Sequence, residues 1–181
     1  MLNNKNLITR LVCYFWQNPL LLAFLVSSSL MAGAYAFQYI GGLEPCDLCW
    51  TQRYAHMAII ALSGAGLLLK SAGGLIYNVM AWGTALALDV SIAVSGYHAG
   101  IEQKWWQGPT TCTSNGLTQS ADMESFFDNM MEAKMVLCDE IPWEMFGISM
   151  AGYNFLISFI VSGFVALALL DKVRKNNPAR N

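Results

Sequence analysis

The sequence predicts an all-α membrane protein, a four-helix transmembrane bundle with a long outer loop, and three observations carry this prediction. Of the 181 residues, 55% are hydrophobic and only 12% are charged, whereas soluble globular chains are about 25% charged. Four apolar segments are each long enough to cross a bilayer, which takes about 20 residues. The charges outside these segments are divided unequally between the two ends of the bundle. We therefore expect a single transmembrane domain over residues 1–181.

The first predicted span covers residues 20–40 and contains no charged residue. A cleaved secretory signal would also follow basic residues, here Lys5 and Arg10, and would end at a small-x-small site such as residues 34–36. We favour a retained span, because residues 11–16 are already apolar and the apolar run is longer than an ordinary signal core.

The other three predicted spans contain little charge. The second, residues 50–69, carries Arg53 near its start, the third, residues 74–97, contains Asp89, and the fourth, residues 146–170, is uncharged. An ionisable group inside a span is costly, so each one indicates a functional or a paired position. We expect Asp89 to be buried and either structurally paired, which we favour, or part of a proton path.

The basic residues indicate the orientation, because loops rich in Lys and Arg stay on the cytoplasmic side. With four spans, both termini and the loop around residue 70 share a side that holds seven of the ten basic residues: Lys5, Arg10, Lys70, Lys172, Arg174, Lys175 and Arg180. The opposite side holds ten of the twelve acidic residues: Glu44, Asp47, Glu102, Asp122, Glu124, Asp128, Glu132, Asp139, Glu140 and Glu144. We therefore expect cytoplasmic termini, with outer loops at residues 41–49 and 98–145.

The five cysteines are divided between the two sides. Cys46, Cys49, Cys112 and Cys138 lie outside, in the compartment where disulfide bonds persist, and Cys13 lies on the reducing side. An even number of outer cysteines is typical of paired thiols. Cys13 fits no pattern, and we interpret it as an inert cytoplasmic thiol.

The long outer loop is too short to form a core of its own. In residues 120–136, Met and Phe recur near helical spacing, which predicts a short amphipathic helix. This helix could lie on the membrane surface, present a flexible Met-rich face to a partner, or merely cover the bundle. The sequence does not decide among these roles.

Cys46 and Cys49 form a Cys-x-x-Cys pair just before the second span. The thiolate is the nucleophile in disulfide exchange, so a redox cysteine needs a lowered pKa. Backbone N–H groups at the start of a helix favour negative charge. Arg53 follows Cys49 by four residues and shares its helical face. Arg53 can therefore stabilise a Cys49 thiolate or donate hydrogen bonds to a bound electron acceptor.

Three other interpretations of this pair are open. A zinc site would need a second close pair or a close histidine, but Cys112 and Cys138 are far apart in the chain, and His98 and His56 fit no ligand spacing. A structural disulfide would ordinarily bridge elements further apart. A tetraspanin-like scaffold, with four spans and a cysteine-bonded outer loop, would not need Arg53 inside a span.

Cys112 and Cys138 both lie in polar stretches of the outer loop. A bridge between them would close a loop of moderate size and could be purely structural. Two cysteine pairs on one face can instead pass electrons by successive thiol–disulfide exchange. The residues alone leave both roles open.

Together these motifs resemble the disulfide bond formation protein B (DsbB) family, the bacterial inner-membrane thiol oxidases that pass electrons to quinone. The resemblance covers most of the chain, from the first span to the last. It rests on the order and spacing of the following motifs: Glu44-Pro45-Cys46-Asp47-Leu48-Cys49, Gln52-Arg53-Tyr54, Tyr97-His98, Glu102, Trp105-Trp106, Cys112, Cys138, Ile141-Pro142-Trp143 and Gly147-Ile148-Ser149-Met150-Ala151-Gly152-Tyr153-Asn154.

The resemblance implies a protein-dithiol:quinone oxidoreductase that supports protein disulfide formation. The Cys112–Cys138 pair would oxidise a periplasmic thioredoxin-fold dithiol oxidase (DsbA-like) through a mixed disulfide, and electrons would pass on to Cys46–Cys49. Ubiquinone or menaquinone near Arg53 would accept the electrons, and no metal or nucleic acid would take part.

The two histidines and two rival functions complete the expectations. His98, at the outer end of the third span, could shuttle a proton, contact the quinone or cap the helix. His56, two turns into the second helix, is interpreted as a satisfied core group. A vitamin K epoxide reductase-like enzyme would share the chemistry, but its Cys-x-x-Cys is expected at the end of a later span. The four-span scaffold is the non-catalytic alternative.

Overall fold

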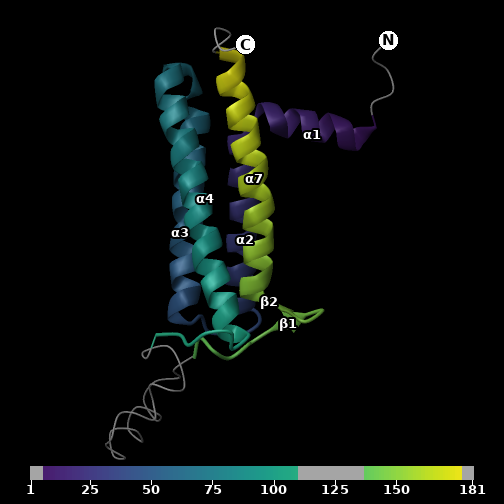
Figure 1. Ribbon diagram of the computed structural model, residues 1–181, viewed down its shortest axis with the longest axis vertical. Coiled ribbons are helices and arrows are strands. Elements are labelled where there is room, and N and C mark those ends of the chain that lie inside the picture. Colours follow the sequence, from purple (N-terminus) through teal and green to yellow (C-terminus); the bar gives the residue numbers. More distant parts are fainter. Residues whose placement is uncertain (1–5, 110–136, 177–181) are drawn as a thin grey trace, which may run out of the picture.

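The computed structural model describes residues 6–109 and 137–176 of the chain. Cys112 and the amphipathic helix predicted at residues 120–136 lie outside the described residues. The described chain is mainly helical, with one short hairpin (Figure 1). Its elements are α1 (Leu7–Gln17), α2 (Pro19–Tyr39), α3 (Asp47–Leu68), the 3-10 turn η1 (Lys70–Ala72), α4 (Gly74–Glu102), β1 (Glu144–Met145), β2 (Ile148–Ser149) and α7 (Met150–Asn176).

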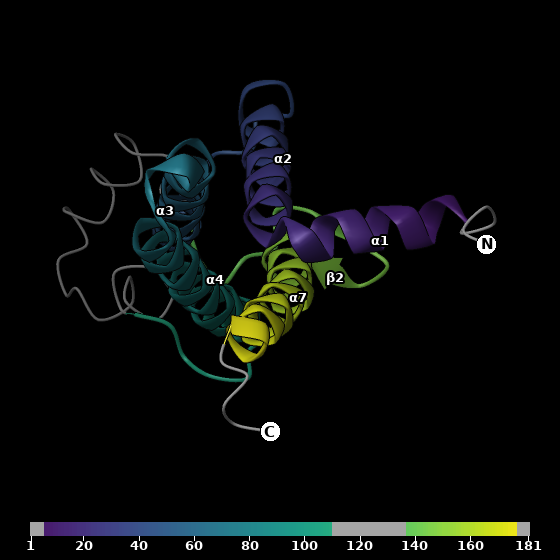
Figure 2. The same cartoon turned by 90° about the horizontal axis from the view of Figure 1, so that it is seen from above.

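Helices α2, α3, α4 and α7 run side by side as a bundle (Figures 1 and 2). Helix α4 packs against α3 and α7, and α2 packs against the same two helices from the other side. Helix α1 and the C-terminal end of α7 lie at one end of the bundle, and the β1–β2 hairpin lies at the other (Figure 1). The start of α3, which carries the Cys-x-x-Cys pair, is at the hairpin end.

Among the described residues, three helices are long and apolar enough to cross a membrane: Pro19–Tyr39, Gly74–Glu102 and Met150–Lys175. The expectation of a helical membrane protein is confirmed in this outline. Helix α3 has 22 residues and packs inside the same bundle, but it is not among the three. Its first turns carry three polar side chains, Gln52, Arg53 and His56.

The bundle has an apolar exterior and a partly polar interior. Large apolar side chains such as Leu86, Phe159 and Ile160 are exposed. Inside, some buried serine and threonine hydroxyls are satisfied within their own helices, as Ser95 donates to the Ser91 carbonyl at 2.6 Å, and others bond to neighbouring helices, as Ser27 does to His56. Lipid provides no hydrogen bonds, so this distribution suits a bilayer better than water.

The interior of the bundle away from the hairpin is a close-packed apolar core. Its buried members are Leu20, Ala23, Ile59, Tyr77, Ala81, Ala85, Leu88, Val161, Val165 and Leu169. Small residues in this core bring the helices close together, because a Cβ on Gly66 of α3 would approach Leu20 to 2.9 Å and Met80 to 3.0 Å. The polar site at the hairpin end therefore lies next to a close-packed apolar core formed by the same helices.

The chain before the first span forms a helix of its own. Asn18 leaves the helical conformation, and Pro19 starts α2 at a position where its missing N–H is not needed. Helix α1 extends away from the bundle (Figure 1). The indole N–H of Trp16 donates to the Asp171 carboxylate at 3.1 Å and ties the end of α1 to α7.

Helix α4 corrects two expectations. It continues to Glu102, so the predicted boundary at residue 97 is too early and His98 lies within the helix. The prediction that Asp89 is buried is also wrong, because Asp89 is exposed on the outer face of α4. Its carboxylate accepts a hydrogen bond of 2.8 Å from Ser162 of α7.

The last predicted span was expected to begin at residue 146, and the helix α7 in this part of the chain begins at Met150. Glu144 pairs with Ser149 in the antiparallel β1–β2 hairpin that precedes it. The turn residues Phe146 and Gly147 have φ values of 54° and 75°, and positive φ at both positions is the requirement of a two-residue type I′ turn. The hairpin places Ser149 at the mouth of the bundle.

Candidate redox active site

The start of α3 brings the two sulfur atoms of the Cys-x-x-Cys pair together. Cys46 is the N-cap of the helix, with an extended backbone, and its Sγ accepts the backbone N–H of Cys49 at 3.2 Å. The two Sγ atoms are 2.6 Å apart. Cys46 and Cys49 are free thiols here, and a disulfide between them requires little movement of the backbone.

The surroundings shift the pKa values of the two thiols in opposite directions. The pKa of Cys46 is raised, because its thiol donates to the Cys49 sulfur and because it is buried. The hydrogen bond from Cys46 lowers the pKa of Cys49 against the opposing effect of burial, and the positive charge of Arg53 adds to this lowering. Both cysteines precede the second predicted span, which begins at residue 50. The thiolate of the reduced pair therefore belongs to Cys49.

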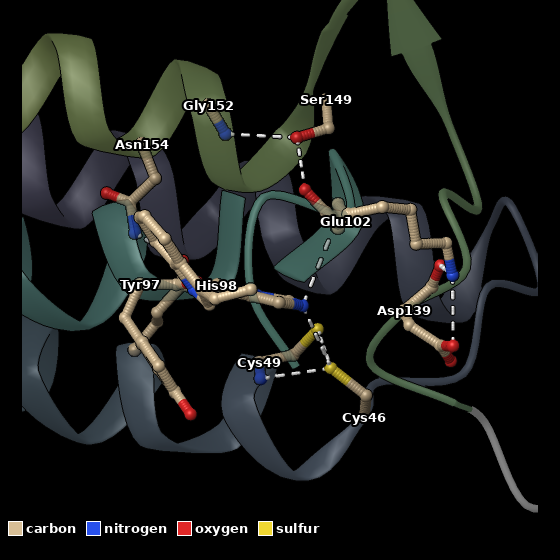
Figure 3. Close-up of polar contacts among 12 residues, drawn as sticks. Cys46, Cys49, Tyr97, His98, Glu102, Asp139, Ser149, Gly152 and Asn154 are labelled. Carbon is tan, nitrogen blue, oxygen red and sulfur yellow. Dashed lines mark hydrogen bonds and ion pairs between the residues drawn. The ribbon is translucent and has the colours of Figure 1, made fainter. Parts of the chain in front are cut away.

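Cys138 lies directly against the Cys-x-x-Cys pair. Its side chain is fully buried and packs with Cys46, and it is held in a disulfide bond. Lys104 at the end of α4 anchors the neighbouring residue, because its ammonium contacts the Asp139 carboxylate at 2.9 Å and the Asp139 carbonyl at 2.8 Å (Figure 3). The structure thus brings together three of the four predicted outer cysteines, and the fourth, Cys112, lies outside the described residues.

Arg53 is buried between α2 and α3. Its guanidinium lies between the rings of Tyr35 and Trp50, at 5.0 Å and 4.9 Å from their centroids. Nη1 donates to the Gln38 side chain at 2.6 Å, and Nη2 donates to a backbone carbonyl of α2 at 3.4 Å. Within the described chain, no carboxylate pairs with Arg53. A buried cation without a paired anion can stabilise negative charge on a neighbour or a ligand.

The ring of His98, on α4, points toward the cysteine pair at the start of α3 (Figure 3). Its Nε2 lies 3.6 Å from the Cys46 sulfur and 3.8 Å from Glu102 Oε1, while Nδ1 lies 2.7 Å from Gln52 Nε2. Glu102 follows His98 by one helical turn and accepts a hydrogen bond from Ser149. The imidazole is therefore fixed on both edges.

A cavity of about 330 Å³ opens beside these groups. Side chains of α2, α3, α4 and α7 line it, and most of its wall is apolar, including Phe37, Trp143 and Ile157. Cys49 and Arg53 contribute polar groups to the wall. Pockets for small ligands are typically about 300–1,000 Å³, mainly apolar, with a few polar groups that orient the ligand. The cavity has both properties.

His98 changes the assessment of a metal site. In the sequence neither histidine has a metal-ligand spacing, but the fold places the ligand atoms of Cys46, Cys49 and His98 within 4.8 Å of one another. Two thiolates on one zinc ion stand about 3.7 Å apart, as tetrahedral Zn–S bonds of 2.3 Å require. The two sulfur atoms here are closer than that, at 2.6 Å, so the geometry favours disulfide chemistry over metal binding.

Several polar residues of the site were named from the sequence only as members of the family motifs, without a role in the site. Gln52 and Asn154 join α3 to α7 through a hydrogen bond of 2.6 Å. The one available signal was the spacing of four residues between His98 and Glu102, which predicts a shared helical face. His56 agrees with its interpretation as a satisfied core group: Ser27 Oγ lies 3.3 Å from its Nδ1, and Asn154 Oδ1 lies 2.8 Å from its Nε2.

The fold and the site together define a class of protein: a helical membrane protein with a redox-competent thiol pair beside an apolar cavity. Comparison with known proteins narrows this class. The family model for disulfide bond formation protein DsbB matches residues 17–168, and the chain belongs to this family.

Individual relatives agree with this assignment. The disulfide bond formation protein B of Hahella chejuensis is 30% identical over 162 residues, which covers 85% of this chain and 92% of that protein. The protein of the same name from Dechloromonas aromatica is 32% identical over 154 residues, covering 81% of this chain and 86% of the relative. No solved structure matches the chain.

Proposed function

We propose that this protein is a membrane protein-dithiol:quinone oxidoreductase that reoxidises a periplasmic thioredoxin-fold dithiol oxidase. The observation that carries the proposal is the contact between Cys138 and Cys46 beside a cavity lined by Cys49 and Arg53. Two cysteine pairs in contact can exchange electrons, and the cavity offers a place for a small apolar acceptor. Membership of the disulfide bond formation family supports the same reaction.

The electrons move in pairs through successive exchange steps. A thiolate of the soluble partner attacks the Cys112–Cys138 disulfide, and the partner leaves oxidised while both loop cysteines are reduced. A thiolate of Cys138 then attacks Cys46, so that a Cys46–Cys138 bond forms, the Cys46–Cys49 bond breaks, and Cys49 leaves with the electron pair. Cys112 next displaces Cys46 from Cys138, which restores the loop disulfide and leaves Cys46 and Cys49 reduced.

The cavity supplies a suitable site for ubiquinone or menaquinone. Its walls match an apolar ring and tail, and the Arg53 guanidinium retains donors beyond those engaged with α2. A bound quinone would accept two electrons and two protons and leave as quinol, regenerating the Cys46–Cys49 disulfide. Arg53 orients the acceptor and stabilises the negative charge that develops on it. The low pKa of Cys49 keeps the electron donor in its thiolate form.

The membrane arrangement in this proposal adds α3 as a fourth span. Helix α3 is long enough to cross the bilayer and lies within the bundle, where its polar first turns face the cavity rather than lipid. Both termini are then cytoplasmic and the cysteine site is periplasmic, in the bacterial inner membrane. The basic residues Arg174 and Lys175 in the last turn of α7 support this orientation.

Reconstituted turnover tests the proposed function. Proteoliposomes that contain the protein and ubiquinone or menaquinone receive a reduced thioredoxin-fold dithiol oxidase, and quinol formation is followed by absorbance. We expect turnover in the wild type and none in Cys49→Ser, while Cys13→Ser serves as the matched control and retains turnover. Transfer that survives in Cys49→Ser contradicts the route, and absence of turnover in every variant supports a non-catalytic scaffold.

A further inference from the structure

A row of four polar side chains, His56, Asn154, Gln52 and His98, leads through the bundle to Cys46. His56 Nε2 lies 2.8 Å from Asn154 Oδ1, and Asn154 Nδ2 donates to Gln52 Oε1 at 2.6 Å. Gln52 Nε2 lies 2.7 Å from His98 Nδ1. The row ends where His98 Nε2 faces the Cys46 sulfur at 3.6 Å. We call these four side chains the amide–imidazole row.

The chemistry of the two amides gives this row a direction. An amide nitrogen only donates hydrogen bonds, and an amide oxygen only accepts them. Because Gln52 uses its oxygen toward Asn154, its nitrogen must donate to His98 Nδ1, which must therefore carry a lone pair. At the other end, Asn154 Oδ1 can only accept, so the hydrogen must lie on His56 Nε2. Every hydrogen bond in the row then points toward Cys46.

The far edge of His98 meets groups that can accept hydrogen bonds. Its Nε2 faces the Cys46 sulfur and, at 3.8 Å, Glu102 Oε1. The ring also hydrogen-bonds the backbone of Cys138, whose carbonyl accepts. Ser149 donates to the other Glu102 oxygen, and the Gly152 N–H donates to Ser149 at 3.1 Å (Figure 3), so the carboxylate is oriented from α7. A neutral ring with its hydrogen on Nε2 presents a donor to the Cys46 sulfur and the Glu102 carboxylate.

We propose that Gln52 and Asn154 are positioning residues that fix His98 in the tautomer with hydrogen on Nε2, so that His98 donates a hydrogen bond to the Cys46 sulfur. The inference rests on the proposed function and assigns His98 to the exchange between the two cysteine pairs. In this tautomer Nε2 holds a hydrogen already and does not take up the proton of Cys46. His98 is a hydrogen-bond donor to sulfur, which differs from the proton shuttle that the sequence suggested.

The exchange chemistry shows where such a donor acts. When Cys112 attacks the Cys46–Cys138 mixed disulfide, a Cys112–Cys138 bond forms and the Cys46–Cys138 bond breaks. Cys46 leaves with the electron pair as a buried thiolate, which is unfavourable without a donor. The His98 Nε2–H lies at the leaving sulfur and stabilises its charge. Glu102, on the other side of the same N–H, keeps the ring turned toward this position.

Nitrogen NMR of the full chain in lipid nanodiscs reads the tautomer directly. The chain contains two histidines, so ¹⁵N-histidine labelling gives two side-chain patterns, and the pattern lost in His98→Asn belongs to His98. In the wild type at neutral pH we expect a protonated Nε2 and an unprotonated Nδ1 at His98. A proton on Nδ1 of the neutral wild-type ring would overturn the proposal, whatever any variant does.

The source of the tautomer is tested at position 52. Gln52→Glu keeps the shape of the side chain but replaces the donor with an acceptor, and we expect Nδ1 of His98 to become protonated. Gln38→Glu is the matched control, because it makes the same change at the half-buried glutamine that contacts Arg53 and should leave the His98 pattern unchanged. A Gln52→Glu spectrum identical to the wild type at His98 would contradict a positioning role for Gln52.

The kinetic consequence is measured by acid-quenched mass spectrometry of the disulfides during turnover. A hydrogen bond to a charged group is worth about one to two factors of ten in rate, so His98→Ala should slow resolution of the Cys46–Cys138 mixed disulfide about tenfold or more. His98→Gln, which keeps an N–H donor, should recover part of this loss, and equal rates in Ala, Gln and wild type would contradict the donor role. The NMR measurement of the tautomer needs neither the soluble partner nor quinone. A failure of the proposed function in the turnover assay can therefore be told apart from a failure of this inference.

Discussion

At the scale of single residues, Cys46 and Cys49 differ although they share one short motif. Cys46 caps the helix, and its thiol donates a hydrogen bond to the Cys49 sulfur. Cys49 accepts this hydrogen bond, and the positive charge of Arg53 also lowers its pKa. The pair therefore has a proton-holding member next to Cys138 and a thiolate member next to the cavity. This division matches a relay in which one cysteine exchanges with protein and the other donates electrons to a small acceptor.

The first prediction concerns the pH dependence of Cys49. Its alkylation rate follows its thiolate fraction, and the hydrogen bond from Cys46 lowers its pKa, so reaction persists below the pH at which ordinary thiols become unreactive. Cys46→Ala removes that donor, and burial then raises the pKa. We expect the midpoint of the alkylation profile to move up by about one to two pH units, measured by iodoacetamide labelling and mass spectrometry. Cys46→Ser, which keeps a hydroxyl donor, should move it less, and an unshifted profile in Cys46→Ala would refute the asymmetry.

The second prediction concerns Arg53, which lies between Tyr35 and Trp50. Arg53→Ala removes donors from the cavity, and the KM for quinone should rise about tenfold to a hundredfold, with little change in the KM for the reduced partner. Steady-state kinetics in proteoliposomes separates the two constants. A purely structural arginine would instead lower the melting temperature and leave the quinone KM unchanged.

At the scale of secondary-structure elements, close helix packing holds the site in place. The Cys-x-x-Cys pair lies at the start of helix α3, which approaches α2 and α4 closely at Gly66. A close contact at Gly66 restricts sliding of α3 along the bundle axis, and it therefore holds the Cys-x-x-Cys pair in position relative to His98. The opposite situation holds at Gly163 of α7, where an added Cβ would meet nothing within 4 Å.

The third prediction compares these two glycines. Gly66→Ala places a methyl group against Leu20 and Met80 and should destabilise the protein by about 1–3 kcal/mol. Gly163→Ala should be neutral or stabilising by up to about 1 kcal/mol, because alanine favours the helix. Unfolding in detergent followed by circular dichroism measures both. If Gly66→Ala proves as stable as Gly163→Ala, α3 is not closely packed in the membrane-embedded bundle.

The sequence predicted those elements that depend on local pattern. Long apolar runs predicted α2, α4 and α7, and the Cys-x-x-Cys spacing with Arg53 one turn later predicted one side of the site. It did not separate α1, because residues 11–16 are as apolar as the span that follows and only Asn18-Pro19 indicates the break. The hairpin at residues 144–149 was also missed, since its two short strands merge with the apolar start of α7.

The remaining part of the site depends on contacts between distant segments. Gln52 meets Asn154, and His98 meets Cys46, only after α4 and α7 have packed beside α3. No local period in the sequence specifies which buried polar groups face one another. Asp89 was mispredicted for the same reason. A single charge in an apolar run indicated burial, but the packed bundle leaves Asp89 at the surface.

At the scale of the whole molecule, the bundle separates two chemical environments. One end carries basic residues and α1, and the other carries the cysteine site, the hairpin and the cavity (Figure 1). The proposal requires the second end to face the oxidising compartment, where a soluble dithiol can reach Cys138. In the proposed function a quinone enters the cavity from the lipid, so the two proposed substrates approach from different phases.

The fourth prediction tests this orientation. Cys13 is exposed on α1 and should react with a membrane-impermeant maleimide only after the cytoplasmic face is opened. A cysteine introduced by Phe146→Cys, at the exposed hairpin turn, should react in intact spheroplasts; both are measured by gel shift, with the remaining cysteines replaced by serine. Labelling of the two sites from the same side would contradict the proposed topology.

The central claim is that Cys46 and Cys138 form the junction between the two cysteine pairs. It is tested most directly in the variant Cys49→Ala/Cys112→Ala, which removes the partner of each. Because Cys138 packs against Cys46, we predict that the two remaining thiols join in an intramolecular disulfide in nearly every molecule, detected by peptide mapping without reduction. Two free thiols in this variant under oxidising conditions, or disulfides between separate molecules only, would contradict the claim.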